Sequence, residues 1–473
     1  MIMEIAAREP IPHALFRGKP VYHGPRLSPS RGAAIPDSNR HHRVLYMVGL
    51  VLAGEAVYAL PFHVARFFRP TVLEAFGLSN TELGIAQAVY GIVAMLAYFP
   101  GGLLADRFPA RTLIAWSLWS TAGGGLYMAT LPGFAGSVMV WGFFGLTTIL
   151  LFWAALIRAT RDWGGIHEQG RAFGLLDGGR GLLAALLASL AALLFGHLFP
   201  DGIAAAGSSD KREALRLVIL GYTAVTAAAG VFAWFALADP HPSDERPLDE
   251  WKPGGEGVRE HILQVVRLPA AWFIAVIVIC AYVAYKGFDN YSLYAVQAFG
   301  LSEVEAAKIT AVGAWMRPVA ALGAGLLGDR FLVSRMTVAC FALLLISQLL
   351  FAVLTPAPGM VWILMTNILA GSAAMFALRA LYYALFEESR IPPPVTGTAV
   401  GLVSVVGYTP DIFVSYAGGI LLDRSPGLAG HQHYFYFLAA FAALGLVVSY
   451  GLMRRLRSRS GDRAAHILPA TER

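Results

Sequence analysis

The sequence has few cysteines and few charged residues, and both shortages limit what the protein can be. Its two cysteines, Cys280 and Cys340, lie inside apolar runs, so they offer neither a disulfide framework nor a zinc site. Asp, Glu, Lys and Arg make up 14% of the 473 residues, whereas a soluble domain has about a quarter of its residues charged. This composition excludes an ordinary soluble protein and indicates a membrane protein.

Enzyme motifs are also missing. The sequence has no glycine-rich Walker loop for ATP, which argues against a primary pump. The histidines at 41–42 and at 431 and 433 have no further ligands near them in sequence, so we expect no metal, no cofactor and no enzymatic activity. The formal charge of +6 requires no nucleic acid, because basic residues gather in the cytoplasmic loops and tails of membrane proteins.

Long apolar runs are what the sequence does contain. Apolar residues make up 57% of the chain and the mean hydropathy is +0.59. Each run has about 20 residues, which spans ~30 Å of hydrocarbon at about 1.5 Å per residue. We expect an all-α membrane protein with spanning helices near 44–66, 80–104, 112–131, 134–160, 171–197, 216–238, 267–290, 303–327, 336–355, 359–386, 394–422 and 432–454.

The second half of the chain repeats the first. The segment AFGLS at Ala75–Ser79 recurs at Ala298–Ser302, an offset of 223 residues (298 − 75), and Asp106 and Asp329 keep the same offset. Chance similarity of apolar helices does not reproduce turn residues at both ends of a helix. We therefore infer a duplicated unit of six helices. Further pairs at this offset are Glu82 with Glu305, Ala88 with Ala311, and Ala97 with Ala320.

The repeated turns carry a known signature. Residues 101–111 read GGLLADRFPAR and residues 325–331 read GLLGDRF. This pattern resembles the signature loop of the major facilitator superfamily, with the last Arg of the second copy displaced to Arg335. The resemblance implies twelve transmembrane helices in two pseudo-symmetric six-helix bundles. It also implies that the loop favours one of two alternating states, a conformational role for Asp106, Arg107, Arg111, Asp329 and Arg330.

Two further stretches, FGLLDGGRG at 173–181 and VGYTPD at 406–411, are similar to a bacterial branch near the nitrate/nitrite and organophosphate porters. Nitrate porters place an Arg on both helix 2 and helix 8. In this chain Ala94 is the repeat partner of Arg317 (94 + 223 = 317), which argues against nitrate as the substrate.

Polar segments and basic residues give the organisation and the orientation. The expected units are a disordered basic tail at 1–43, a bundle at 44–238, a linker at 239–266, a second bundle at 267–454 and a basic tail at 455–473. The tails, the linker and the two Asp-Arg turns hold most of the basic residues. The positive-inside rule therefore predicts a bacterial inner-membrane protein with both termini in the cytoplasm.

Four charged residues are expected near the middle of the membrane: Glu55, Arg180, Arg317 and Asp411. Each costs at least ~2.5 to 3.5 kcal/mol there, so each requires a partner or a function. We expect them to share a water-accessible chamber between the halves, with Arg317 and Arg180 holding an anionic solute and Glu55 or Asp411 carrying a proton. The alternative is that these residues form purely structural ion pairs.

Other residues extend this hypothesis. Asp177 is a further candidate for proton coupling, and the Gly and Pro of VGYTPDIF predict a broken helix beside Asp411. Tyr58, Tyr408 and Trp315 either line the chamber or simply pack. Arg158 and Arg379, near the cytoplasmic ends of their helices, either act in gating or extend to the membrane surface.

The function expected from these features is secondary transport of a small anionic solute by alternating access, coupled to protons or to exchange, by a monomer in the lipid bilayer. Two alternatives stay open at this stage. One is a proton-driven exporter of amphipathic compounds, which would need a wide apolar cavity and carboxylates without paired arginines. The other is a membrane sensor that kept the fold and does not transport.

Overall fold

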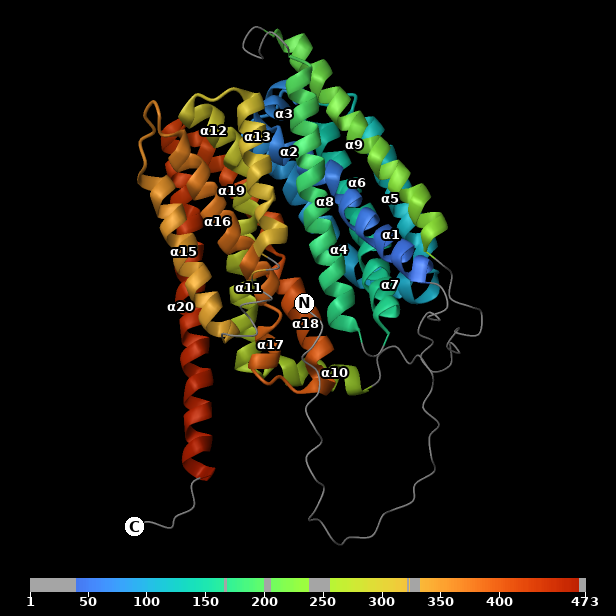
Figure 1. The fold of residues 1–473 in the computed structure, drawn as a ribbon, viewed down its shortest axis with the longest axis vertical. Helices are drawn as coiled ribbons and strands as arrows, with labels where there is room; N and C mark the ends of the chain where they lie inside the picture. Colours follow the sequence, from blue (N-terminus) through green and yellow to red (C-terminus); the bar gives the residue numbers. More distant parts are fainter. Residues whose placement is uncertain are drawn as a thin grey trace, which may run out of the picture.

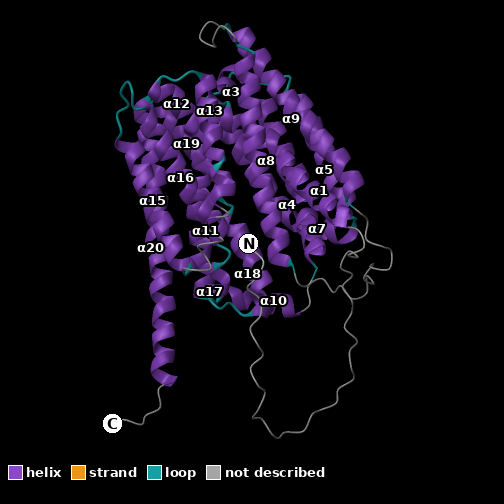
Figure 2. Ribbon diagram, in the orientation of Figure 1, coloured by secondary structure: helices purple, strands orange, loops and turns teal. Residues whose placement is uncertain are grey.

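A computed structural model describes residues 40–165, 168–199, 206–237, 256–320, 323 and 332–467. The described chain is helical and contains no strand within those residues (Figure 2). Asp329 and Arg330, the tails at 1–39 and 468–473, and most of the expected linker lie outside the described residues.

The first half of the chain forms helices that end near residue 237. They are α1 (Arg40–Tyr58), η1 (Ala59–His63), α2 (Val64–Phe67), α3 (Arg69–Phe76), α4 (Asn80–Arg107), α5 (Ala110–Met128), α6 (Phe134–Leu146), η2 (Thr147–Trp153), α7 (Ala154–Gly164), α8 (Gln169–His197) and α9 (Ser208–Ala236). The segments η1 and η2 are π-helical, so the first spanning helix is interrupted in its second half and the fourth near mid-length.

The second half begins with a short helix that precedes its first span. Its helices are α10 (Glu256–Val266), α11 (Pro269–Gly287), η6 (Phe288–Asn290), α12 (Tyr291–Phe299), α13 (Glu303–Ala314), α15 (Val333–Val353), α16 (Val361–Leu381), α17 (Leu385–Glu388), α18 (Pro393–Gly407), α19 (Pro410–Arg424) and α20 (Leu428–Ile467). The break between α18 and α19 at Tyr408 and Thr409 confirms the expected broken helix.

Ten helices of the described chain are long and apolar enough to cross a membrane. The two remaining spans are α5 and α13, of which 12 residues are described before Trp315. Figure 1 shows the first-half helices, blue to green, beside the second-half helices, yellow to red. At 40 residues, α20 is ~60 Å long and extends well beyond a ~30 Å hydrocarbon layer.

Matched helix starts confirm the sequence repeat. Gly77 and Gly300 both have φ of 66°, the left-handed conformation that glycine adopts without steric cost. A capping box follows each one, Ser79 with Glu82 and Ser302 with Glu305. These turn residues keep the 223-residue offset (300 − 77), so the same local devices start the second helix of each half.

One pair of helices holds the two halves together along a close seam. A Cβ added at Gly91 of α4 would lie 2.7 Å from the backbone carbonyl carbon of Asp411 on α19, so only glycine permits this approach. At the end of the seam, the Asp423 carboxylate accepts hydrogen bonds from the backbone N–H groups of Asn80 (3.2 Å) and Thr81 (2.7 Å). A residue of one half therefore caps the first turn of a helix in the other.

Charged and polar side chains also join described residues of the two halves at the end of the bundle where α4 begins. At that end Lys211 Nζ lies 2.7 Å from Glu303 Oε1 and 3.2 Å from Glu74 Oε2, and Thr71 donates to Glu303. The opposite end holds the Asp106 turn and the start of α18. Described ion pairs and hydrogen bonds thus join the two halves at the end where α4 begins.

The turn between α7 and α8, at the Asp106 end, is fixed to α1 by an ion pair. Arg43 Nη2 lies 2.6 Å from Glu168 Oε2, and Arg171 Nη1 lies 2.9 Å from the other oxygen. The hydrogen bonds from Arg43 and Arg171 hold the pKa of Glu168 below its usual range.

Candidate functional site

A buried carboxylate on α1 is the centre of the first charged cluster. Glu55 is 3% exposed, and its Oε2 lies 3.1 Å from Arg317 Nη1 and 3.5 Å from Arg180 Nε. Its other oxygen, Oε1, lies 3.2 Å from His63 Nε2. The structure therefore brings together three of the four residues expected at mid-depth, and it joins both halves through them.

Glycines make room for the two guanidinium side chains. A Cβ at Gly54 would lie 2.9 Å from Cδ of Arg180, and a Cβ at Gly181 would lie 3.0 Å from Cγ of Arg317. Arg180 also lies over the ring of Tyr58, with Cζ 5.6 Å from the ring centroid. Glycines on α1 and α8 thus leave the room that both guanidinium side chains occupy.

Asp177 extends this cluster along α8. Its Oδ1 accepts a hydrogen bond from Arg317 Nη2 at 3.2 Å, and its side chain is 53% exposed. It lies eight residues after Gln169, the first residue of α8, which is about 12 Å along the helix. Arg317 therefore bridges a fully buried carboxylate and one that is half exposed.

Asp411, the fourth expected residue, belongs to a second cluster instead. Its Oδ2 accepts a hydrogen bond from the Tyr282 hydroxyl at 3.0 Å, and its Oδ1 lies 3.6 Å from Lys286 Nζ. Lys286 also lies 3.0 Å from Asp289, which in turn pairs with Arg66 Nε at 2.6 Å. The four residues expected to share one chamber therefore lie in two clusters, because Lys286 is the cation beside Asp411.

Aromatic rings connect the two clusters. Tyr58, which lies under Arg180, is 6.0 Å from Phe62 between ring centroids. Lys286 Nζ lies 4.9 Å from the centroid of Phe62. Short side-chain contacts thus lead from the Glu55 cluster to the Asp411 cluster across the boundary between the halves.

Two pairs of repeat partners belong to these clusters. Arg66 and Asp289 are 223 residues apart, which is the repeat offset, and they pair directly with each other. His63 and Lys286 have the same separation (286 − 63), and each contacts a carboxylate. The first helices of the two halves therefore meet at the pseudo-two-fold axis with different charged residues at equivalent positions.

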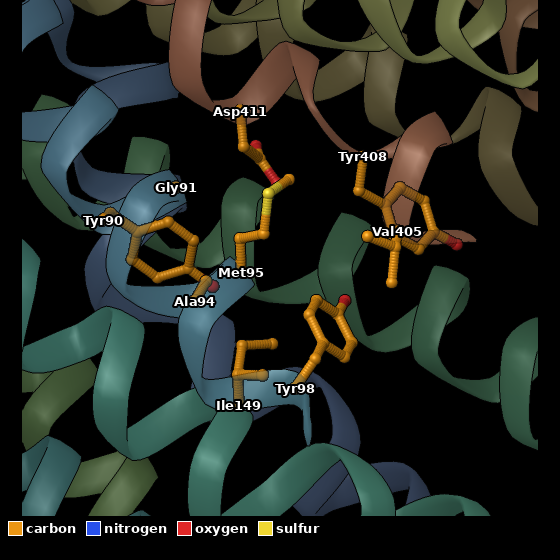
Figure 3. A pocket seen from close by; sticks show the side chains of 9 residues that line it. All are labelled: Tyr90, Gly91, Ala94, Met95, Tyr98, Ile149, Val405, Tyr408 and Asp411. Atoms are coloured by element: carbon orange, nitrogen blue, oxygen red, sulfur yellow. The ribbon is translucent and has the colours of Figure 1, made fainter. Parts of the chain in front are cut away.

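A small cavity lies between α4 and the α18–α19 break (Figure 3). Its volume is about 20 Å³, enough for a water molecule. The residues that line it are Tyr90, Gly91, Ala94, Met95, Tyr98, Ile149, Val405, Tyr408 and Asp411. Tyr408 and Asp411 therefore border a small space between the two halves.

Arg158 and Arg379, both expected near the cytoplasmic ends of their helices, make different contacts. Arg158 donates to the backbone carbonyl of Ala105 and lies 3.9 Å from Asp162, so it ties helices of one half together. Arg379 turns into the bundle, with Cζ 4.2 Å from the ring centroid of Tyr285 and 5.5 Å from that of Tyr282. Of the two roles expected for Arg379, extension to the membrane surface does not fit, because aromatic rings of α11 hold the guanidinium inside.

Asp106 and Arg107 are exposed, at the end of α4. Arg111 lies over the ring of Trp234, 4.9 Å from its centroid. Trp315 donates a hydrogen bond to Ser189 Oγ at 3.0 Å, which is a contact between the two halves.

Sequence reasoning missed His63 and Arg66. Both are buried; His63 is the last residue of the π-helical segment η1 and Arg66 follows it, and an extra residue per turn there rotates the side chains. Pro61 inside an apolar run was the available signal for an irregular helix. No group of three or more His, Cys, Asp or Glu residues that could hold a metal ion is present in the described part of the chain.

Comparison with known proteins agrees with this architecture. The family model of the Major Facilitator Superfamily matches residues 51–415. The chain is 28% identical over 426 residues to the inner membrane protein YihN of Escherichia coli (strain K12), which covers 88% of this chain and 96% of YihN. It is also 28% identical over 304 residues, 59% of each chain, to the probable nitrate/nitrite antiporter NarK1 of Thermus thermophilus.

A solved structure shares the fold at low sequence identity. It is the crystal structure of a bacterial homolog to the human lysosomal transporter Spinster, in an inward-facing and unoccupied conformation. The TM-score is 0.69 at 14% identity, over 89% of this chain and 98% of that one. The family match, the inner-membrane relative and the duplicated bundle lead to one conclusion: the chain belongs to the major facilitator superfamily, as a multi-pass transporter of the bacterial inner membrane.

Proposed function

We propose that the protein is a secondary active transporter that moves a small anionic solute by alternating access. The observation that carries this proposal is the convergence of Arg180 and Arg317, from opposite halves, on the single buried carboxylate of Glu55. Guanidinium groups stay charged when they are dehydrated, and their planar donors match carboxylate or phosphate oxygens. A solute with such oxygens can take the place of Glu55.

The same geometry supports proton coupling. When Glu55 is ionised it neutralises the two arginines, whereas a protonated Glu55 leaves both cations to the solute. His63, at 3.2 Å from Glu55, is placed to exchange that proton, and Asp411 is a second candidate carrier in its own cluster. The half-exposed Asp177 beside Arg317 requires water at its depth, which supports access from the Asp106 end.

The remaining roles belong to this proposal as well. Tyr58 and Tyr408 lie next to the charged clusters and are proposed to contact the solute. Asp106, Arg107 and Arg111 are proposed to act with the other half when the seam at the opposite end opens. The positive-inside rule supports a cytoplasmic location of both termini. The relationship to a probable nitrate/nitrite antiporter supports an anionic solute, over 59% of the chain.

Arg317 provides the direct test. Purified protein in proteoliposomes is assayed for uptake of radiolabelled anions, with an imposed proton gradient and with counterflow. Arg317→Gln is expected to lower uptake about 100-fold or more, because a charge-assisted contact to the solute is removed. The control is Arg212→Gln, which makes the same chemical change at an exposed site on α9. Anion uptake that survives Arg317→Gln unchanged contradicts the proposed role of this residue.

A further inference from the structure

Arg379 differs from the other cations around the site. Arg66, Arg180, Lys286 and Arg317 each have a carboxylate partner. Among the described residues, no carboxylate pairs with Arg379, and its Nη1 is buried without a hydrogen-bond partner. A buried donor with a full charge is costly to leave without an acceptor, so this atom is available to an acceptor group on the solute.

The surroundings of Arg379 stabilise its charge without using its donors. The guanidinium lies over the faces of Tyr285 and Tyr282, and a cation held on a ring face keeps its N–H groups directed outward in its own plane. Arg66 also contacts the ring of Tyr285, with Cζ 4.8 Å from its centroid. An anion beside Arg379 is therefore attracted by two guanidinium groups, of which only Arg66 has a carboxylate partner.

The formal charges around the site also favour an anionic solute. In the two clusters and at Arg379, the described cations are Arg66, Arg180, Lys286, Arg317 and Arg379. The described carboxylates are Glu55, Asp177, Asp289 and Asp411. With His63 neutral, five cations and four carboxylates leave one positive charge, which a monoanionic group would balance.

Hydroxyl groups next to this position indicate what else the solute carries. The ring of Tyr282 lies 5.0 Å from that of Tyr408, whose hydroxyl lies 2.9 Å from the hydroxyl of Tyr383. Tyr383 in turn lies 2.9 Å from Ser404 Oγ. Tyr408 also borders the small cavity, together with Tyr98 of the other half. Phenol groups of this kind both stack on a ring and exchange hydrogen bonds with hydroxyls.

We infer that Arg379 is the docking residue for the oxyanion group of a hydroxylated organic anion, whose body lies against the tyrosines of α11 and the α18–α19 break. This inference rests on the proposed function and assigns its solute class. A bare inorganic anion such as nitrate would satisfy the charge of Arg379 and leave the tyrosine surface unused. A carboxylate or a phosphate would bind with the same chemistry.

The test uses purified full-length protein in detergent and follows thermal unfolding with four probes: gluconate, glucose 6-phosphate, glucose and nitrate. Gluconate or glucose 6-phosphate is expected to raise Tm at millimolar concentration, while neutral glucose and nitrate have much weaker effects. Gluconate and glucose 6-phosphate also distinguish a carboxylate from a phosphate group. Arg379→Gln is expected to raise the half-saturating concentration about tenfold or more, and Arg379→Lys to recover part of the loss.

Arg212→Gln, with the same side-chain change outside the site, is the matched control and is expected to bind as the wild type does. The Tm without ligand shows whether each variant is folded. Wild-type affinity in folded Arg379→Gln overturns the inference, as does equal binding of nitrate or binding of neither organic anion. If Arg317→Gln abolishes anion uptake while Arg379→Gln does not, the proposed function stands and the role of Arg379 fails. If no anion is taken up by the wild type, the proposed function itself fails.

Discussion

The two halves of the molecule share their scaffold and differ in their charges. Both start the second helix with a left-handed glycine and a capping box, at positions 223 residues apart. At the pseudo-two-fold axis, however, the first half has Arg66 where the second has Asp289. A residue on such an axis faces its own copy, so identical residues would place like charges together. A single chain with two different halves can place opposite charges at these two positions, which two identical halves could not.

The largest expected effect comes from restoring the symmetry. Asp289→Arg would place two guanidinium groups at the axis, where breaking the buried pair alone costs ~3–5 kcal/mol. We expect almost no folded, monodisperse protein after purification in detergent. The exchanged pair, Arg66→Asp with Asp289→Arg, should recover a substantial part of the yield. Normal yield from the single variant would show that these residues do not face each other.

A smaller effect on folding is expected from a change at the buried carboxylate of the first half, Glu55. Glu55→Gln leaves Arg180 and Arg317 without their shared buried carboxylate, with an expected loss of ~3–5 kcal/mol in stability. Because glutamine imitates a protonated glutamate, solute exchange should persist while proton-driven accumulation is lost. Thermal unfolding and proteoliposome assays measure the two effects.

Asp177→Asn is the matched control for stability, because this half-exposed carboxylate should contribute ~0–1 kcal/mol. A Glu55→Gln variant that is as stable as Asp177→Asn would contradict the central place of Glu55. Accumulation driven by a proton gradient in the Glu55→Gln variant would assign the coupled proton to another residue.

The smallest expected effect concerns the seam between the halves. Gly91→Ala places a methyl group against the backbone of α19 and should cost ~1–3 kcal/mol, because neither backbone can easily move. Gly102→Ala on the same helix meets nothing within 4 Å and should be neutral or slightly stabilising. The difference in Tm between these variants measures the packing of the seam, and equal values would show that α4 and α19 are not in close contact.

Much of the architecture could be predicted from the sequence because it depends on local patterns. The repeated turn residues predicted the duplication, and the Gly and Pro around Asp411 predicted the broken helix. Charged residues in apolar runs identified Glu55, Arg180 and Arg317, since a charge at that depth requires a partner.

The pairing of these residues could not be predicted. Counting along a helix gives depth, but it does not give the direction of a side chain around the helix axis. For that reason Asp411 was grouped with Glu55, Arg180 and Arg317, and extension to the membrane surface was left open for Arg379. His63 and Arg66 were missed because the π-helical segment η1 shifts their directions, and no sequence pattern specifies such a turn reliably.

The cap that Asp423 provides has a consequence for how the protein can move. A carboxylate bound to the free N–H groups of a helix end stabilises it by ~1 kcal/mol, and water can replace the carboxylate when it withdraws. Asn80 and Thr81 would then be hydrated, and α4 would keep its helical form. The contact between Asp423 and the start of α4 can therefore open reversibly to solvent without unfolding α4.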